Sequence, residues 1–248
     1  MRSWQGHPLK GDLGRHAAEW DALNKTRFND HPLLDSRFWN GLLRHFKRPG
    51  VMLWELRDCD TVLAMCLLER TGWGRWGSYL PGQAQLGPVM IHEAAMVDEL
   101  LAALRPMALQ VDLLCVDPDI CRLDPEPGRR VRTIPHAMTM NVLTGGPFED
   151  YWEHRSTALR QNLRRYERQA EKAGVSFTHR VIDRADAVAE GVVRYAELES
   201  KGWKGAEGTA LAPGNEQARF YTELLAAYAA TGQAAVQEFW AGDELAAS

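Results

Sequence analysis

Helix-like and strand-like segments alternate through the second half of the chain, and the clearest of them is a helix at residues 156–173. Its apolar residues recur at spacings of four, three, four and three, as one face of an α-helix requires. They are Leu159, Leu163, Tyr166, Ala170 and Ala173. Gly174 follows at a position where helices commonly end. This regularity, in a chain of 248 residues of which 45% are hydrophobic, excludes a disordered tail, a collagen-like repeat and a disulfide-dense miniprotein.

The residues after this helix continue the alternation. Asn215 is a good N-cap for a further helix, and Gly232 ends it. The predicted elements are a strand at 175–182, a helix at 185–201, a loop at 203–213, a helix between Asn215 and Gly232, a strand at 234–240 and a returning strand at 244–248.

The returning strand at residues 244–248 is short beside an ordinary strand of about five or six residues. A lone hairpin edge is a poor place for a domain to end, because an unpaired edge can pair with other chains. We therefore expect the chain to be part of a longer protein. A natural terminus with a frayed edge strand is the alternative.

The first 145 residues mix helical and strand-like segments. Within the helical region at residues 20–46, Ser36 is a candidate N-cap. The other predicted elements are a hairpin of strands at 51–57 and 62–69, a long loop with a short strand at 71–88, a helix at 93–105, a buried strand at 110–116 and a strand at 136–143. This order predicts an α+β fold with a mixed sheet. The Gly, Gly and Pro at residues 145–147 mark a boundary between two domains, residues 1–146 and 147–248.

The composition argues against a protein that coats nucleic acid. Its 29 Lys and Arg residues and 33 Asp and Glu residues give a net charge of −4, whereas such proteins carry a basic excess. DNA is therefore not an expected partner, although a local basic patch remains possible. The sequence shows neither an apolar leader at its N-terminus nor a run of about 18 apolar residues, so we expect a cytoplasmic protein without a membrane span. The four cysteines form no CxxC pair and are expected to be reduced: Cys59, Cys66, Cys115 and Cys121.

Positive charge concentrates on the helix at 156–173. Six Lys or Arg residues and two Glu lie between His154 and Lys172. Arg160, Arg164, Arg168 and Lys172 are four apart and share one ridge. Like charges at this spacing repel, so a phosphate, a carboxylate or an acidic partner surface would stabilise them. We therefore take Arg160 and Arg164 as candidate substrate-binding residues, and a solvated face balanced by Glu167 and Glu171 remains the alternative.

The loop after the helix at 185–201 contains several side chains of the types found in binding and catalytic sites. Trp203, Lys204 and Glu207 place an aromatic ring, a cation and a carboxylate among three glycines. A Lys204–Glu207 pair would orient an acceptor amine, or Glu207 would serve as a general base if burial raised its pKa. The alternative is a plain connection with Trp203 in the core and the charged side chains exposed.

Other motifs fail. The sequence contains no GxGxxG, GxxxxGK[ST] or GxSxG pattern, and His92-Glu93 is not followed by a second His at zinc-protease spacing. One acidic loop could hold a cation, but its prolines favour an exposed turn: Asp117, Asp119, Asp124 and Glu126. No metal site is predicted.

Three stretches carry a family resemblance. They are SxxLRxNLRRxERxxEKxG at 156–174, YxxLExxGWKGxEGTAL at 195–211 and the terminal GDELAAS, with RFYxxLL between the last two. Together they resemble the GNAT-type acyltransferases of the CelD/BcsL group, which are related in architecture to the FemAB peptidyltransferases. The resemblance is most specific over residues 156–248.

The resemblance implies two GNAT-like domains, of which the second carries the donor site. It implies acyl transfer from acetyl-CoA or another acyl-CoA to an amine or hydroxyl, without a metal, often on envelope or exopolysaccharide precursors. In that family a backbone N–H at a splayed central strand stabilises the oxyanion, and a helix N-terminus binds the donor pyrophosphate. The strands at 234–248 would be the second and third of such a domain, so the central strand and the pyrophosphate loop are expected after Ser248. A chain limited to these residues would then lack the coenzyme A site and be inactive.

Under this interpretation Arg160, Arg164, Trp203 and Lys204 hold the acceptor, and Glu207 is the catalytic base. Two alternatives remain. One is a FemAB-like enzyme that uses aminoacyl-tRNA as donor and a peptidoglycan precursor as acceptor. The other is a non-catalytic GNAT fold that binds a partner through the arginine ridge.

Overall fold

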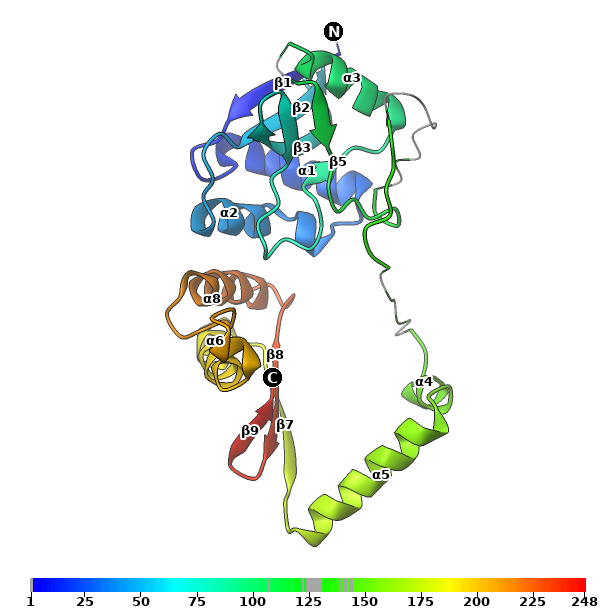
Figure 1. Ribbon diagram of the computed structural model, residues 1–248, viewed down its shortest axis with the longest axis vertical. Helices are drawn as coiled ribbons and strands as arrows, with labels where there is room; N and C mark the ends of the chain where they lie inside the picture. Colours follow the sequence, from blue (N-terminus) through cyan, green and yellow to red (C-terminus); the bar gives the residue numbers. More distant parts are fainter. Residues whose placement is uncertain are drawn as a thin grey trace. The chain divides into compact units, whose positions relative to one another are not determined.

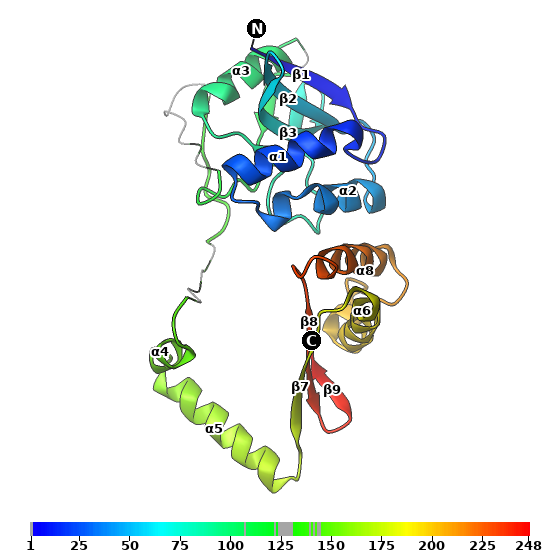
Figure 2. The ribbon, with the colours of Figure 1, turned by 180° about the vertical axis from the view of Figure 1, so that it is seen from behind.

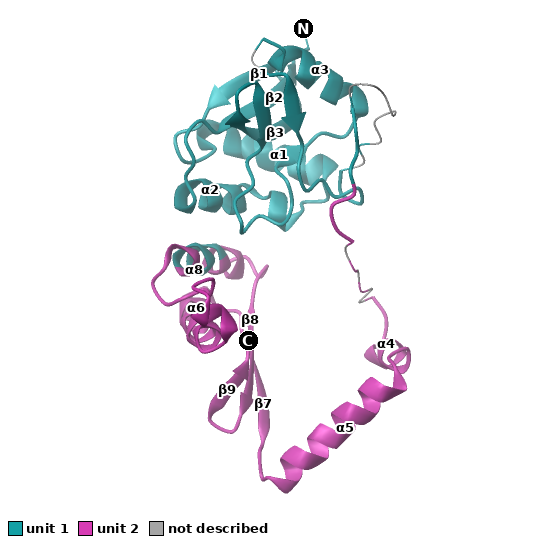
Figure 3. Ribbon diagram, in the orientation of Figure 1, with its two compact units in different colours: residues 1–134, 219–224 teal, residues 135–218, 225–248 magenta. Residues whose placement is uncertain are grey.

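The computed structural model describes residues 2–106, 108–121, 123, 131–138, 140, 142 and 145–248. The chain divides into two compact units (Figure 3). Unit 1 comprises Met1–Ile134 and Arg219–Leu224, and unit 2 comprises Pro135–Ala218 and Leu225–Ser248. Among the described residues, each unit has one β-sheet.

Unit 1 contains a mixed sheet, as predicted. In chain order its elements are β1 (Ser3–Pro8), η1 (Gly14–His16), α1 (Ala17–Arg27), η2 (Pro32–Leu34), α2 (Ser36–His45), β2 (Met52–Asp58), β3 (Thr61–Gly72), β4 (Arg75–Ser78), β5 (Val89–Met90), α3 (Ala94–Leu104) and β6 (Gln110–Asp112). The strands lie in the order β1-β2-β3-β4-β6, with β5 paired to β3 (Figure 1). All pairs are antiparallel except β4 and β6, which are parallel.

Helices cover both faces of this sheet. On one face, Met96 and Leu100 of α3 join Trp54 and Leu56 of β2 in the buried core. Glu55 lies between these two strand residues, so its side chain points to the opposite face. Helix α1 lies against that second face, where Figure 2 shows it running across the strands.

Several expectations for unit 1 are corrected. Strand β1 was not predicted, and the region 20–46 forms two α-helices. The N-cap of α2 is Asp35, whose carboxylate accepts from the Arg37 N–H at 2.8 Å, because the predicted cap Ser36 instead donates its hydroxyl to Asp21 at 2.6 Å.

The two last strands predicted for the N-terminal half differ most from the structure. Strand β6 is shorter than predicted and only partly buried. The predicted strand at 110–116 does not continue to its end, where Cys115 has a positive φ of 51°. The described residues among 136–143 form no strand, and Thr139, Asn141 and Leu143 lie outside the described residues. Met138 is 96% exposed, so no neighbouring layer supports a strand there. Asp124 and Glu126 of the acidic loop also lie outside the described residues.

Unit 2 has a three-stranded antiparallel sheet in the order β7-β8-β9. The helices and strands from residue 145 onward are α4 (Phe148–Glu153), α5 (Thr157–Lys172), β7 (Phe177–Ile182), α6 (Ala185–Ser200), α7 (Trp203–Ala206), α8 (Glu216–Ala229), β8 (Val236–Ala241) and β9 (Glu244–Ala247). Helix α6 packs across all three strands. Its Gly191 permits a close approach, because a Cβ there would lie 3.2 Å from a methyl group of Val236.

The strands and long helices of this half were predicted correctly. Ser156 caps α5 by accepting the Leu159 N–H at 3.2 Å, and Asn215 caps α8 by accepting the Ala218 N–H at 2.8 Å. Two short helices were missed: α4, and α7 within the predicted loop at 203–213. Helix α5 has no buried residue, and the side chains of its apolar stripe are partly exposed.

The two sheets begin with the same order of elements. Strand, two helices and two antiparallel strands occur as β1-α1-α2-β2-β3 and again as β7-α6-α8-β8-β9, with the short α7 between the two helices of the second set. In each set the strands lie side by side in chain order. The chain therefore contains an internal structural repeat.

Candidate functional site

The junction between α6 and α7 is built around the carboxylate of Glu199. Lys204 donates to it from Nζ at 2.6 Å, the Tyr195 hydroxyl donates at 2.9 Å, and the backbone N–H of Leu211 donates at 2.6 Å. The Glu199 side chain is 13% exposed and that of Lys204 is 43% exposed. One carboxylate thus ties together the end of α6, the first turn of α7 and the segment that follows it.

Both charges of this pair are stabilised. Burial alone would raise the pKa of Glu199, but hydrogen bonds from Lys204, the Leu211 N–H and Tyr195 more than offset it, so the pKa lies below its ordinary value. The hydrogen bond from Lys204 to Glu199 raises the pKa of the lysine. Near neutral pH, Lys204 is therefore a fixed ammonium group and not a proton acceptor.

Gly205 lets α7 fold back against the end of α6. A Cβ at this position would lie 2.0 Å from the carbonyl oxygen of Ser200, so no side chain fits without moving the backbone. Trp203 begins this helix and is 68% exposed. The alternative in which Trp203 is tucked into the core is therefore wrong, and its ring faces solvent one residue before Lys204.

Glu207 lies at the end of α7 and is exposed. Within residues 145–248 its carboxylate makes no hydrogen bond or ion pair, and Lys204 pairs with Glu199 instead. The Lys204–Glu207 pair suggested by the sequence is thus not formed. The sequence analysis missed Glu199, although Tyr195 and Glu199 are four residues apart and so share one helix face.

Arg160 and Arg164 lie on α5, apart in sequence from this junction. No acidic residue lies in the first turn of α5, and the buried Nε atoms of Arg155 and Arg160 have no hydrogen-bond partner among the described residues. Arg164 lines a shallow hollow with Glu167 and Glu171 but forms no ion pair with them in this part of the chain. Trp203 and Lys204 are neighbours in α7. Within residues 145–248, no hydrogen bond or ion pair joins a side chain of α5 to α6 or α7.

The described strand-to-helix junction of unit 2 is poorly suited to a diphosphate. Between β7 and α6, Arg184 Nε donates to the carboxylate of Asp186 at 3.0 Å, and Asp186 is in the first turn of α6. That carboxylate already occupies the positive end of the helix dipole, and Asp183 adds a second negative charge. Because Arg184 pairs with Asp186, one net negative charge remains at this junction, and it disfavours binding of a coenzyme A pyrophosphate.

Comparison with known protein families concerns the second half of the chain. Residues 157–248 match the family described as the acetyltransferase (GNAT) domain. The match supports a GNAT-superfamily domain in this segment and an acyltransferase type of activity, and the segment contains Arg160, Arg164, Trp203, Lys204 and Glu207. Searches of curated proteins and of solved structures found no match.

Membrane crossing requires a helix that is both long and apolar. In the described portions of the chain, none of the helices has these two properties together.

Proposed function

We propose that the chain belongs to a GNAT-type acyltransferase of the CelD/BcsL group, which transfers an acyl group from acetyl-CoA or another acyl-CoA to an envelope or exopolysaccharide precursor. The observation that carries this proposal is the acetyltransferase (GNAT) match over residues 157–248. The internal repeat supports two domains of related fold, which we propose to be GNAT-like and to span residues 1–146 and 147–248. An acyl-CoA donor is consistent with action in the cytoplasm.

Trp203 and Lys204 would bind the acceptor. An exposed indole ring offers a flat apolar surface to the C–H face of a sugar ring, and the neighbouring ammonium offers charge to an anionic group. Glu199 fixes that ammonium at 2.6 Å, so little conformational entropy is lost when an acceptor binds. This pairing of ring and cation fits a phosphorylated sugar.

Arg160 and Arg164 would bind a phosphate of the same acceptor. Guanidinium groups bind phosphate with paired hydrogen bonds, and no acidic side chain of the described residues pairs with Arg160. The N-terminus of α5 adds a favourable dipole.

Glu207 is exposed in the structure, and it would act as general base once a bound acceptor covers its carboxylate. The acceptor nitrogen or oxygen attacks the thioester carbonyl carbon, the new C–N or C–O bond forms, and the acceptor proton passes to the Glu207 carboxylate. The C–S bond then breaks, and coenzyme A leaves as a thiol after taking up a proton. Lys204, held protonated by Glu199, would serve as a cation in this step.

The donor diphosphate would bind outside residues 145–248. Asp183 and Asp186 disfavour it at the start of α6. We therefore expect acceptor binding to be measurable in this chain, and donor binding to be weak.

Two measurements test the proposal. The first is binding of a nucleotide-activated amino sugar by calorimetry, compared among the unaltered chain, Lys204→Met and the control Lys201→Met. Loss of binding in Lys204→Met alone supports the acceptor site. The second is release of coenzyme A thiol from acetyl-CoA by a longer protein that includes these residues, supplied with amino sugars or hydroxylated sugars. No transfer to any acceptor would refute the proposed activity.

The basic surface of α5 favours one second candidate, a FemAB-like enzyme that uses aminoacyl-tRNA. Six Lys or Arg residues between His154 and Lys172 would contact an RNA backbone. Binding of charged tRNA that weakens steeply with salt would favour this candidate over acyl-CoA. Tight partner binding without transfer from either donor would instead indicate a non-catalytic module.

A further inference from the structure

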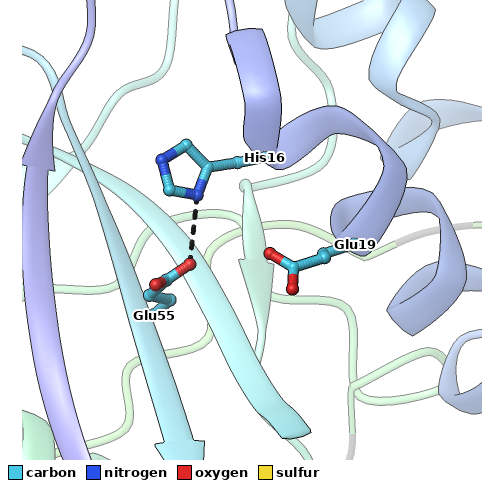
Figure 4. A group of neighbouring side chains, drawn as sticks. All are labelled: His16, Glu19 and Glu55. Atoms are coloured by element: carbon cyan, nitrogen blue, oxygen red, sulfur yellow. Dashed lines mark hydrogen bonds and ion pairs between the residues drawn. The ribbon is translucent and has the colours of Figure 1, made fainter. Parts of the chain in front are cut away.

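A group of polar side chains, two of them buried and one partly exposed, lies in unit 1, outside the proposed acyltransferase site. It consists of His16 in η1, Glu19 in α1 and Glu55 in β2 (Figure 4). We propose that these three side chains bind one divalent transition-metal ion of the Zn²⁺ type. The sequence analysis predicted no metal in this protein.

Glu55 is the centre of the group. It is 2% exposed, on the sheet face opposite the apolar core formed with α3. Its Oε2 lies 3.2 Å from Nδ1 of His16, and its Oε1 lies 3.1 Å from Nε2 of His7 and 2.7 Å from Nε of Arg57. Burial of a carboxylate costs free energy unless charged or polar partners compensate it. Arg57 alone would neutralise Glu55, so the two additional imidazoles need another explanation.

The separations suit a metal ion. Zn²⁺ binds nitrogen and oxygen ligands at about 2.0–2.2 Å, which places neighbouring ligand atoms of a tetrahedral site about 3.3 Å apart. The 3.2 Å between Nδ1 of His16 and Oε2 of Glu55 matches that spacing. One ligand atom from each of the three residues lies within 4.8 Å of the others. The side chain of Glu19 is 40% exposed, so its Oε1 can move closer while Oε2 keeps its contact with Arg57.

Arg57 holds the two carboxylates without using every oxygen. Its Nε donates to Oε1 of Glu55, and one terminal nitrogen contacts Oε2 of Glu19 and lies 3.5 Å from Oε2 of Glu55. Among the described residues, Oε1 of Glu19 makes no hydrogen bond, and Oε2 of Glu55 would exchange its long contact with Arg57 for a metal ion. Ligating carboxylates are usually oriented by hydrogen bonds of this kind.

The hydrogen bonds of His16 assign its tautomer. Nε of Arg15 donates to Nε2 of His16 at 3.4 Å, so Nδ1 carries the hydrogen that faces Oε2 of Glu55. A metal ion at Nδ1 would displace this proton, so its binding should release protons. Arg15 opposes binding, because it adds positive charge next to the imidazole.

Unit 2 provides an internal comparison. Strand β8, the counterpart of β2 in the repeat, also carries a buried glutamate, Glu238, which is 1% exposed. Its partners are Nε of Arg194 at 2.7 Å and Nε1 of Trp240 at 3.0 Å, and no histidine in the described residues bonds to it. An arginine and a ring N–H therefore satisfy such a glutamate. The imidazole of His16 and the second carboxylate in unit 1 are the additional features that a metal explains.

The types of ligand atom indicate which metal ion binds. One imidazole with two carboxylates suits Zn²⁺ better than Mg²⁺, which prefers oxygen ligands and keeps several waters. The hollow at the site is lined by Gln5, His7, Arg15, His16, Glu19, Glu55 and Arg57, so solvent can complete the coordination.

The test is a titration of the metal-free chain with Zn²⁺ and, separately, Mg²⁺, followed by calorimetry and thermal unfolding. We expect one Zn²⁺ per chain, a rise in Tm that grows with Zn²⁺ concentration, and no comparable effect of Mg²⁺. Glu19→Gln keeps a partly exposed side chain of the same size and should weaken Zn²⁺ binding about tenfold or more. Arg15→Ala should tighten binding, because it removes the competing cation.

Two controls distinguish this site from adventitious binding. His179→Ala removes an exposed histidine in β7, and Glu190→Gln removes an exposed glutamate in α6. Both should bind Zn²⁺ as the unaltered chain does. The absorption spectrum of bound Co²⁺ gives a second readout, which should be lost in His16→Ala. Absence of Zn²⁺ binding, or unchanged binding in both Glu19→Gln and His16→Ala, would overturn the proposal.

Discussion

Nζ of Lys204 lies 2.6 Å from Oε1 of Glu199, across the junction of α6 and α7. The two residues are five apart in sequence, and the turn between the helices brings them together. Because the same carboxylate also accepts the Leu211 N–H, its removal releases a backbone donor and an ammonium group at once. The conformation of the segment that carries Trp203 and Lys204 thus depends on one acidic side chain.

Glu199→Ala should destabilise unit 2 by about 1–3 kcal/mol, because it leaves a charged donor and a partly buried N–H without their acceptor. The free energy of unfolding in urea measures this loss. Glu197→Ala is the matched control, since its side chain is exposed two residues earlier on the same helix. It should stay within about 0.5 kcal/mol of the unaltered chain. Equal effects of both substitutions would show that the bonds to Glu199 contribute nothing.

The Glu199–Lys204 pair also predicts a dependence of stability on pH. The pKa of Glu199 is lower in the folded chain than its ordinary value of 4.5, so its stabilising effect is fully present above that value and is lost as pH falls through the folded pKa. The pKa of Lys204 is raised above 10.5, so its contribution is present below that value and is lost only at strongly alkaline pH. The difference in free energy of unfolding between the unaltered chain and Glu199→Gln should therefore be constant near neutral pH and shrink in acid. A difference that grows in acid would contradict this assignment.

Gly205→Ala should disrupt α7 more than an ordinary glycine substitution does. Its Cβ would lie 2.0 Å from backbone oxygen, which a side-chain rotation cannot relieve. We expect a loss of about 1–3 kcal/mol or more in stability, with faster hydrogen exchange at residues 203–211. Gly146→Ala has open space around its Cβ and serves as the control. Unchanged exchange at residues 203–211 would show that α7 tolerates a side chain there.

Local patterns in the sequence predicted most elements of unit 2. Ser156 and Asn215 cap α5 and α8 through their own side chains, and such contacts span only three residues. The hairpin of β8 and β9 needs only a tight turn between two apolar segments. Elements of this kind are encoded within a short window, so sequence reasoning finds them.

Features that depend on distant residues were not predictable. Strand β1 contains Gly6 and Pro8, which disfavour strands, but a Cβ at Gly6 would lie 2.9 Å from the Trp54 ring, so the glycine makes room for a side chain of β2. His16 and Glu55 are 39 residues apart, and their meeting follows from the packing of η1 on the sheet. His16 and Glu19 at a spacing of three were the only local signal of that cluster.

Arg160 and Arg164 can be tested by charge reversal. If they bind a phosphate of the acceptor, Arg160→Glu with Arg164→Glu should abolish binding of a nucleotide-activated sugar and remove most of its salt dependence. Arg168→Glu with Lys172→Glu is the control toward the other end of α5, because it changes the charge of the same helix by the same amount. Loss of binding in this control to the same degree would indicate a general charge effect instead of a site.

The ion pair between the partly exposed Arg194 and the buried Glu238 predicts a larger loss of stability than an exposed ion pair does. Glu238 is 1% exposed and receives hydrogen bonds from Arg194 at 2.7 Å and from Trp240 at 3.0 Å. Arg194→Met would leave a buried carboxylate with one neutral donor, which should cost about 3–5 kcal/mol in urea unfolding. Arg194 also lies 3.7 Å from Glu190, whose side chain is 80% exposed, and Glu190→Gln should change stability by less than about 1 kcal/mol. Adding Glu238→Gln to Arg194→Met should recover part of the loss, because the buried charge is then gone. A double variant no more stable than Arg194→Met would mean that packing of the arginine side chain, and not the unpaired charge, accounts for the effect.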